Sequence, residues 1–160
     1  MLRILLPAML VLTTSVFATE PDDQRFAHTL YIQPYSKLRQ AAELGDPEAQ
    51  FDLAYLYYKA GTDPAITGMI QSDKLAAQWY RKAALQGHGS AQYNMAVLHL
   101  QGRGVERDPV EAYAWLLQSS SHGHEGSLVL IDELNVVLND KQIAAARERS
   151  TKLGVSKSNP

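Results

Sequence analysis

The amino-acid sequence predicts an all-α fold in which helical hairpins stack into a solenoid. The first observation is internal repetition, because residues 41–58 recur in altered form at 83–100, an offset of 42 residues. The second is the recurrence of residues 76–88 at 112–124, an offset of 36 residues. Periods of 20–50 residues are typical of small units that cannot bury their apolar face alone and therefore stack on their neighbours.

The two offsets differ by six residues, which indicates that the first copy of a 36-residue unit carries an insertion. The extra residues fall within 60–71, a stretch rich in Gly, Thr, Pro and Asp that predicts a loop. We expect repeats at about 47–86 and 89–121 within a solenoid that extends over 34–153, followed by a tail at 154–160. The composition, 46% hydrophobic and 20% charged, is ordinary for one globular domain.

Each repeat begins with a predicted helix whose start has favourable capping residues. Asp46 is a good N-cap, and Pro47 suits the first helical position because its missing N–H is not needed there. Small and apolar residues then fall on one helical face and predict a packing surface. These residues are Ala49, Leu53, Ala54 and Tyr57 in the first copy and Ala91, Met95, Ala96 and His99 in the second.

The second helix of each repeat is predicted to start near Ser72 and near Asp108, which are again good N-caps. Its packing face is formed by Ala76, Trp79, Ala83 and Ala84 in the first copy and by Ala112, Trp115, Ser119 and Ser120 in the second. Small side chains at these positions let neighbouring helices approach closely. Helix ends in a left-handed conformation are predicted at Gly45, Gly87 and Gly123.

Partial units flank the two repeats. Residues 34–44 predict the closing helix of a preceding half-unit, and 124–153 predict a C-terminal cap with helices at 125–138 and 140–153. Asp132 stands where both repeats have alanine, which indicates looser packing of this final pair. A terminal cap needs a polar outer face. The basic residues expected to supply that face are Lys141, Arg147, Arg149 and Lys152.

The first 18 residues are typical of an export signal. Arg3 precedes an apolar run over 4–16, and small residues surround a cleavage site after Ala18. The run is shorter than the roughly 20 residues that span a bilayer, so we expect cleavage there rather than an uncleaved anchor, and no stable membrane insertion afterwards. The protein is then exported to the periplasm, with residues 19–33 as an N-terminal extension. Because the chain has no cysteine, it carries neither disulfides nor a lipid attachment site.

The second copy resembles the Sel-1-like repeat, a relative of the tetratricopeptide repeat. The matching residues are Ala83-Ala84-Leu85-Gln86-Gly87-His88, Ala91-Gln92-Tyr93-Asn94, Gly102-Arg103-Gly104-Val105, Asp108 and Ala112 with Trp115. The resemblance extends over roughly 35–153, and the first copy departs from it at Ser72 and in the long loop. It implies a small exported bacterial member of the family, a right-handed stack of hairpins and an adaptor role in protein complexes, without catalysis.

Little in the sequence points to catalysis. A Gly-x-Ser-x-Gly turn and a phosphate-binding glycine loop are both absent, and the lack of cysteine excludes thiol nucleophiles and thiolate metal ligands. The formal net charge is −2, with 15 basic against 17 acidic residues, so no nucleic acid is expected as a partner. We therefore predict a non-enzymatic protein with no catalytic residue, no metal and no other cofactor.

The histidines offer an alternative to that prediction. His122 and His124 lie beside Glu125, a combination that could bind a metal ion. His88 and His124, however, occupy equivalent positions directly after a helix-ending glycine, so the repeat already explains both. The spacing also differs from the i, i+4 pattern that places two imidazoles on one helical face. His99 replaces an inward-facing aromatic residue and is expected to be a hydrogen-bonded core histidine.

In solenoids of this kind the first helix of each hairpin lines the concave side. The residues expected on that surface are Phe51, Tyr55, Tyr58, Lys59, Tyr93, Val97, Leu100 and Gln101. Exposed aromatic side chains in a groove usually mark partner sites. For Phe51 and Tyr93, packing between neighbouring hairpins is an equally good interpretation, whereas Tyr55 and Tyr58 favour the groove. The 60–71 loop is a second candidate for partner contact.

These observations favour a periplasmic adaptor or inhibitor that binds one protein or extended peptide of the cell envelope without turnover. Two roles fit equally well, namely holding an envelope assembly together and neutralising a toxin. One alternative is a binder of a small ligand or cell-wall fragment that uses the same tyrosines. The least supported alternative is a metal-dependent hydrolase around His122 and His124.

Overall fold

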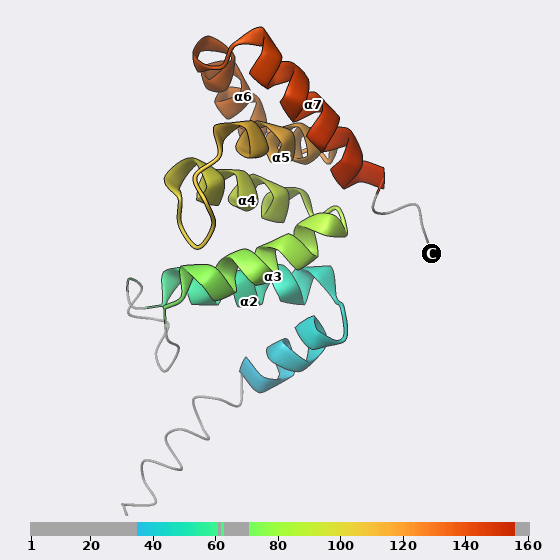
Figure 1. Cartoon of the computed structure of the whole chain (residues 1–160). Helices are drawn as coiled ribbons and strands as arrows, with labels where there is room; N and C mark the ends of the chain where they lie inside the picture. The colour runs from blue at the N-terminus through green and yellow to red at the C-terminus, as the bar shows by residue number, and fades with distance from the viewer. Residues whose placement is uncertain (1–34, 61, 63–70, 156–160) are drawn as a thin grey trace, which may run out of the picture.

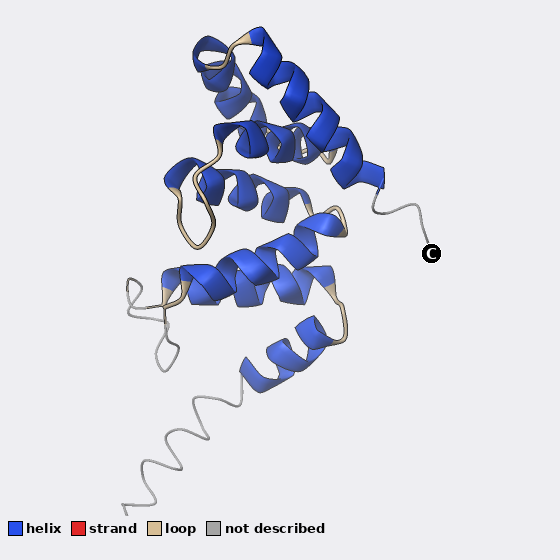
Figure 2. Cartoon of the chain, viewed as in Figure 1, coloured by secondary structure: helices blue, strands red, loops and turns tan. Residues whose placement is uncertain are grey.

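The chain is helical apart from short connections and contains no strand in the part described (Figure 2). The computed structural model describes residues 35–60, 62 and 71–155. The predicted all-α class is therefore confirmed. The expected export signal at 1–18, the extension at 19–33 and most of the 60–71 loop lie outside the described residues.

A short helix at residues 35–43 precedes the labelled helices. These are α2 (Pro47–Lys59), α3 (Asp73–Leu85), α4 (Gly89–Gln101), α5 (Pro109–Ser121), α6 (Gly126–Val137) and α7 (Asp140–Val155). They form a stack in which α2 pairs with α3, α4 pairs with α5, and α3 packs against α4 (Figure 1). The prediction of stacked helical hairpins is confirmed.

The helices start and end where the sequence predicts. Asp46 accepts hydrogen bonds from the backbone N–H groups of Glu48 and Ala49 at 2.9 and 3.0 Å. Asp108 caps α5 in the same way, and Ser72 caps α3. These side chains satisfy N–H groups that have no partner within the helix. Left-handed backbone conformations follow at Gly45, Gly87 and Gly123, with φ of 100°, 89° and 82°.

The core consists largely of alanine and a few large side chains. Every residue predicted on the four packing faces is buried except Ser120, which is half-buried. Ala54, Ala83, Ala96 and Ala112 are each 0% exposed, so the helices approach one another closely at these positions. Trp115 fills the largest volume among the fully buried side chains of the described chain.

A repeated hydrogen bond joins successive units. The Gln50 Nε2 donates to the carbonyl oxygen of Ala42 at 3.0 Å, and the Gln92 Nε2 donates to that of Ala84 at 2.9 Å. Both glutamines are buried. The two donors are 42 positions apart in the sequence, and so are the two acceptors. Helix 35–43 therefore lies against α2 as α3 lies against α4, which makes it the second helix of an incomplete unit.

The C-terminal pair departs from this arrangement. α6 packs against α5 as expected, but α7 crosses back over α5 and barely touches α6 (Figure 1). The Gln118 Nε2 donates to the Ser150 carbonyl oxygen at 2.8 Å, and Arg149 pairs with Asp108 and Glu111 at 2.6 and 3.2 Å. The expected basic residues of α7 are all exposed, as a terminal cap requires.

Replacement of Asp108 separates its capping role from its ion pair with Arg149. Burial by itself raises the pKa of the Asp108 carboxyl, but hydrogen bonds from Arg149 and the backbone of α5 outweigh it and lower the pKa below the usual 3.8. We expect Asp108→Ala to lower the free energy of unfolding at pH 7 by about 1–2 kcal/mol. Asp108→Asn keeps the cap and should lose less than about 1 kcal/mol, because the pair is partly exposed.

The pH dependence tests this assignment. A carboxyl whose pKa is lowered by folding contributes stability above its unfolded pKa and loses that contribution as the pH falls through the folded value. The deficit of Asp108→Asn should therefore be present at pH 7 and vanish below about pH 3 in urea unfolding curves. A deficit that stays constant with pH would contradict the ion-pair contribution.

Candidate partner-binding surface

The sequence-predicted binding residues lie on α2 and α4, but they differ in accessibility. Tyr55 is 41% exposed and Gln101 is also exposed. The other six predicted residues, Phe51, Tyr58, Lys59, Tyr93, Val97 and Leu100, are half-buried. The side chains available to a partner are therefore fewer than the sequence pattern suggests.

Phe51 and Tyr93 pack between neighbouring hairpins. The Phe51 ring stacks on His88 with centroids 4.5 Å apart, and the Tyr93 ring stacks on His124 at 4.4 Å. Phe51 also contacts Tyr80 at 5.6 Å. The same aromatic–histidine pair thus recurs in both repeats. We assign both rings primarily to inter-hairpin packing, the second of the two interpretations that the sequence left open.

The remaining surface is called the α2–α4 surface and consists of Tyr55, Tyr58, Lys59, Val97, Leu100 and Gln101. Two of these residues, Tyr58 from α2 and Val97 from α4, meet at a pocket of about 40 Å³. The fold thereby brings together side chains that are 39 positions apart in the sequence. The pocket is completed by Tyr80, Asn94 and Leu98.

Tyr80, on the second helix of the first hairpin, lines this pocket although its side chain is almost completely buried. Burial is the main reason why the pKa of its hydroxyl is raised far above the usual 10.0, and the phenols of Tyr58 and Tyr55 add to the increase. A hydrogen bond with the Asn94 side chain acts in the opposite direction. The hydroxyl therefore stays protonated, but the Tyr80 side chain is only 1% exposed and is not itself accessible to a partner.

Arg103 covers Tyr58 from the α4–α5 connection. Its guanidinium carbon lies 4.3 Å from the Tyr58 ring centroid, and its Nε and Nη2 donate to the two carboxylate oxygens of Asp73 at 3.0 and 2.7 Å. The hydrogen bond to Asp73 is the main reason why the pKa of Arg103 is raised. A bidentate pair fixes the orientation of the guanidinium. Arg103 therefore holds the Tyr58 ring in one position.

Sequence reasoning missed both Tyr80 and Arg103. Arg103 lies in a turn that the repeat pattern already explains, and its partner Asp73 is 30 residues away. Tyr80 lies next to the predicted packing residue Trp79, where no local signal shows that its hydroxyl reaches the opposite side of the hairpin. Only the close packing of α2, α3 and α4 brings these groups together.

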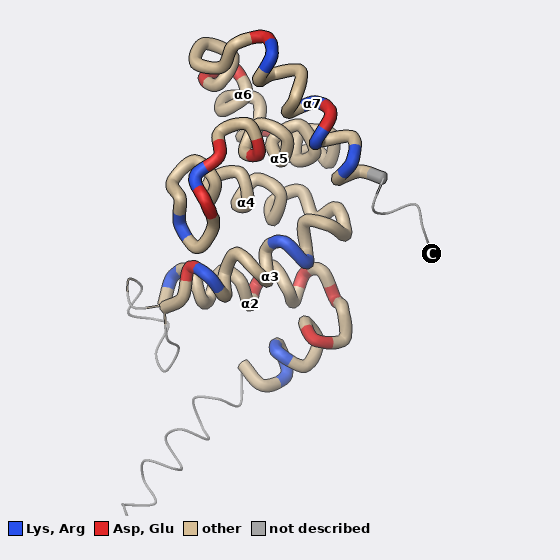
Figure 3. The backbone as a smooth tube through the Cα atoms, in the orientation of Figure 1, with Lys and Arg blue, Asp and Glu red and all other residues tan. Residues whose placement is uncertain are grey.

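Acidic residues adjoin the tyrosines. Burial, followed by the neighbouring Glu48 carboxylate, raises the pKa of Asp52 above its usual 3.8. The Lys59 Nζ lies 6.0 Å from the Tyr55 ring centroid. In the described part, basic and acidic residues are interspersed and α4 carries neither, so the basic residues do not gather in one segment (Figure 3). This distribution does not favour a polyanionic partner.

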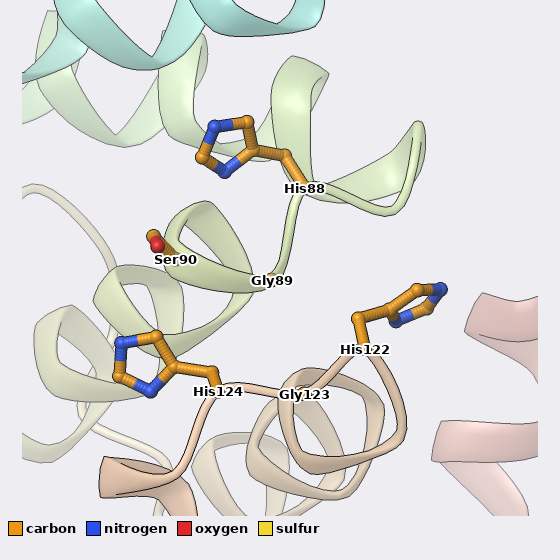
Figure 4. A pocket seen from close by; sticks show the side chains of 6 residues that line it. All are labelled: His88, Gly89, Ser90, His122, Gly123 and His124. Carbon is orange, nitrogen blue, oxygen red and sulfur yellow. The ribbon is translucent and has the colours of Figure 1, made fainter.

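The three loop histidines surround an open pocket of about 220 Å³ but do not converge on it (Figure 4). The His88 Nδ1 accepts the N–H of Ala91 as the N-cap of α4, and its Nε2 lies 3.1 Å from Glu48. The His122 Nδ1 donates to the Gln118 carbonyl oxygen at 2.8 Å, and the ring points away from the other two (Figure 4). His124 stacks on Tyr93 as described above. No group of three or more metal-ligating residues occurs within the described ranges.

His99 is buried as expected, at 9% exposure, but only one of its nitrogens is satisfied. The Nδ1 donates to the Glu106 carbonyl oxygen at 3.0 Å. The Nε2 is buried and has no hydrogen-bond partner among the described residues. The expectation of a fully hydrogen-bonded core histidine is therefore wrong for this nitrogen.

None of the described helices is both long and apolar enough to cross a membrane. The sequence profile of the Sel1 repeat matches residues 47–88 and 89–124. A curated relative, the chitin synthase regulator SKT5 of Saccharomyces cerevisiae, is 31% identical over 103 residues, which are 63% of this chain and 13% of that protein.

Two solved structures are similar in fold. One is a protective antigen present in uropathogenic Escherichia coli strains that displays an SLR fold, with a TM-score of 0.66 and 30% identity over 75% of this chain and 24% of the other. The second is a Sel1 repeat protein from Oxalobacter formigenes, with a TM-score of 0.54 and 32% identity over 60% of this chain and 68% of the other. Two repeats match the Sel1 profile, and the chain covers more than two thirds of a Sel1 repeat protein to which it is 32% identical. This chain therefore belongs to the Sel1 repeat family.

Proposed function

We propose that this protein is a non-enzymatic, exported interaction module that binds one protein or extended peptide in the bacterial cell envelope through the α2–α4 surface. Sel1-repeat proteins generally mediate protein–protein interaction. To this general role we add an exported location, a single partner and the α2–α4 surface as the binding site. The protein acts either as an adaptor for that partner or as its inhibitor. These two roles differ only in what the partner does.

The observation that carries the proposal is the pair of tyrosines on α2, of which Tyr55 is 41% exposed and Tyr58 is half-buried beside a small pocket that the buried Tyr80 also lines. Tyrosine supplies a large rigid contact area together with a polar group, and such residues dominate the binding energy of many interfaces. Because Arg103 and Asp73 already fix Tyr58, its ring would lose little side-chain entropy on binding. Asp52 beside it favours a partner segment that offers hydrogen-bond donors.

A protein partner is better supported than a small ligand at this surface. The pocket between Tyr58 and Val97 has a volume of about 40 Å³, close to that of a single water molecule, whereas pockets for organic ligands are usually larger by about tenfold. A shallow surface with a small central depression suits a single side chain of a larger partner. The first 18 residues support export, because their order of charge, apolar run and small residues is that of a signal peptide.

The experiment is an affinity capture from the envelope fraction of the source bacterium, using protein purified after expression of the full chain. Its N-terminal residue is expected to be Thr19. We expect one stoichiometric partner, which Tyr55→Ala/Tyr58→Ala should bind at least about tenfold more weakly when the purified partner is titrated by calorimetry. The double variant must show the helical circular dichroism of the parent protein.

Leu75→Ala is the matched control, since Leu75 is 37% exposed but lies on α3, outside the α2–α4 surface. Its affinity for the partner should be unchanged. Equal binding by the tyrosine variant would exclude this surface as the binding site. An unprocessed N-terminus in the cytoplasmic fraction would exclude the proposed location independently of the surface.

A further inference from the structure

The outer face of α6 exposes four large apolar side chains. Its buried stripe contains Ser127 and Leu134, and Leu138 follows directly after the helix. The opposite face presents Leu128, Val129, Val136 and Val137, which are 56%, 60%, 88% and 76% exposed. They are four of the seven exposed large apolar residues in the described chain. Exposed apolar side chains gathered on one helix face usually mark an interaction site.

The patch exists because α6 lacks the helix that its position in the repeat requires. α2 and α4 are each paired with the following helix, which covers one side of them. After α6, however, α7 is held over α5 by Arg149 and by the hydrogen bond between Gln118 and Ser150. α6 is therefore the first helix of a hairpin whose second helix lies elsewhere.

The opposite end of the described part of the chain begins with a second helix. The equivalent bonds of Gln50 and Gln92 make helix 35–43 a second helix, and no first helix precedes it within the described residues. Lys37 and Leu38 stand 42 positions before Trp79 and Tyr80, and in the complete hairpin the Tyr80 ring packs against Phe51 of α2. Lys37 is exposed, Leu38 is half-buried, and Leu44 just beyond this helix is 82% exposed.

We infer that helix 35–43 of a second copy of this chain packs on the outer face of α6 and completes the hairpin between the two molecules. Charge complementarity supports this occupant. The exposed carboxylates Asp132 and Glu133 lie in the middle of the α6 patch, and Lys37 lies on the complementary helix. A symmetric pairing of two α6 helices would instead bring four carboxylates together at its centre, which is unfavourable.

An interface of this kind is heterologous, since each copy uses a different surface toward each neighbour. Such contacts continue into open chains unless the geometry closes them into a ring. Assembly would therefore extend the solenoid and present the α2–α4 surface several times in a row. The inference does not depend on the proposed function, because it uses other residues and a different measurement.

Two blocked variants test the interface directly. Lys37→Glu/Leu44→Asp alters only the N-terminal surface, and Val136→Asp/Val137→Asp alters only the α6 patch. All four side chains are exposed, so both variants should keep the circular dichroism and melting temperature of the parent protein. In analytical ultracentrifugation, the parent protein should associate increasingly with concentration, and each variant alone should remain a monomer. An equimolar mixture should form a one-to-one dimer and nothing larger, because each variant keeps one intact surface.

Leu75→Asp serves as the control, since it places the same charge at an exposed leucine away from both ends, and it should associate like the parent protein. A parent protein that stays monomeric at every concentration would overturn the inference. Self-association by the Lys37→Glu/Leu44→Asp variant alone would overturn it as well, because it would indicate a symmetric α6 contact. A mixture that remains monomeric would do the same.

Discussion

Gly104→Ala should lower the free energy of unfolding by about 2–4 kcal/mol. Gly104 has a φ of +71°, which costs an alanine strain energy because its Cβ approaches the following carbonyl. The added Cβ would also overlap the backbone carbonyl oxygen of Asp73 at the start of α3. The atoms that the Cβ would meet belong to the backbone of Asp73 and Lys74 and not to a flexible side chain. The turn itself must therefore move away from the first hairpin.

That movement would have a functional consequence as well. The turn carries Arg103, whose contacts with Asp73 and Tyr58 both depend on its position. Gly104→Ala is therefore expected to weaken partner binding at the α2–α4 surface along with stability. Urea unfolding followed by circular dichroism measures the first effect, and calorimetric titration of the partner below the unfolding transition measures the second.

Gly123→Ala is the matched control for backbone strain. Gly123 has a similar φ of +82°, but no atom lies within 4 Å of an added Cβ. Its substitution should cost about 1 kcal/mol, which is the left-handed strain alone. Equal losses for the two variants would contradict the contact between the turn and α3.

Trp115→Ala should lower the free energy of unfolding by about 3–5 kcal/mol, the cost of deleting a large side chain from a core that cannot collapse around the cavity. Trp115 is 0% exposed and is surrounded by helices that are held close by alanines. A loss of this size is a large part of the stability of a typical domain. The variant is therefore expected to be partly unfolded at 37 °C.

Trp115→Phe separates packing from hydrogen bonding. The Trp115 Nε1 is buried and has no hydrogen-bond partner among the described residues, so phenylalanine removes an unsatisfied donor together with part of the ring volume. We expect a loss of only about 1–2 kcal/mol in the same unfolding measurement. A loss as large as that of Trp115→Ala would indicate that this N–H is satisfied, for example by a buried water molecule.

The sequence predicted the helices and their ends well because these depend on local chemistry. Asp46 and Asp108 bind backbone N–H groups two and three residues away, and Gly87 adopts a conformation that its own missing side chain permits. The packing faces were predictable for a related reason, since a stack of equal units repeats its buried positions at a fixed spacing. Ala54 and Ala96 are both 0% exposed for this reason.

The candidate site was only partly predictable. The sequence located Tyr55 and Tyr58 on the α2–α4 surface, but Tyr80 and Arg103 joined them through contacts across α2, α3 and α4. The positions of Phe51 and Tyr93 were ambiguous, because an aromatic ring on such a helix is equally suited to an exposed groove and to packing between neighbouring hairpins. The stacking of each ring on a histidine from the next turn decides between them.

By itself, the sequence determined the family, the order of the helices, their caps and the small side chains that let them stack. The tertiary structure alone decided where the second helix of the C-terminal incomplete unit lies. Arg149 and Ser150 draw α7 onto α5, and the apolar face of α6 is left uncovered as a result. The physical reason is that capping and periodicity act within a few turns of chain, whereas the choice between two packing partners depends on distant side chains that meet only after folding.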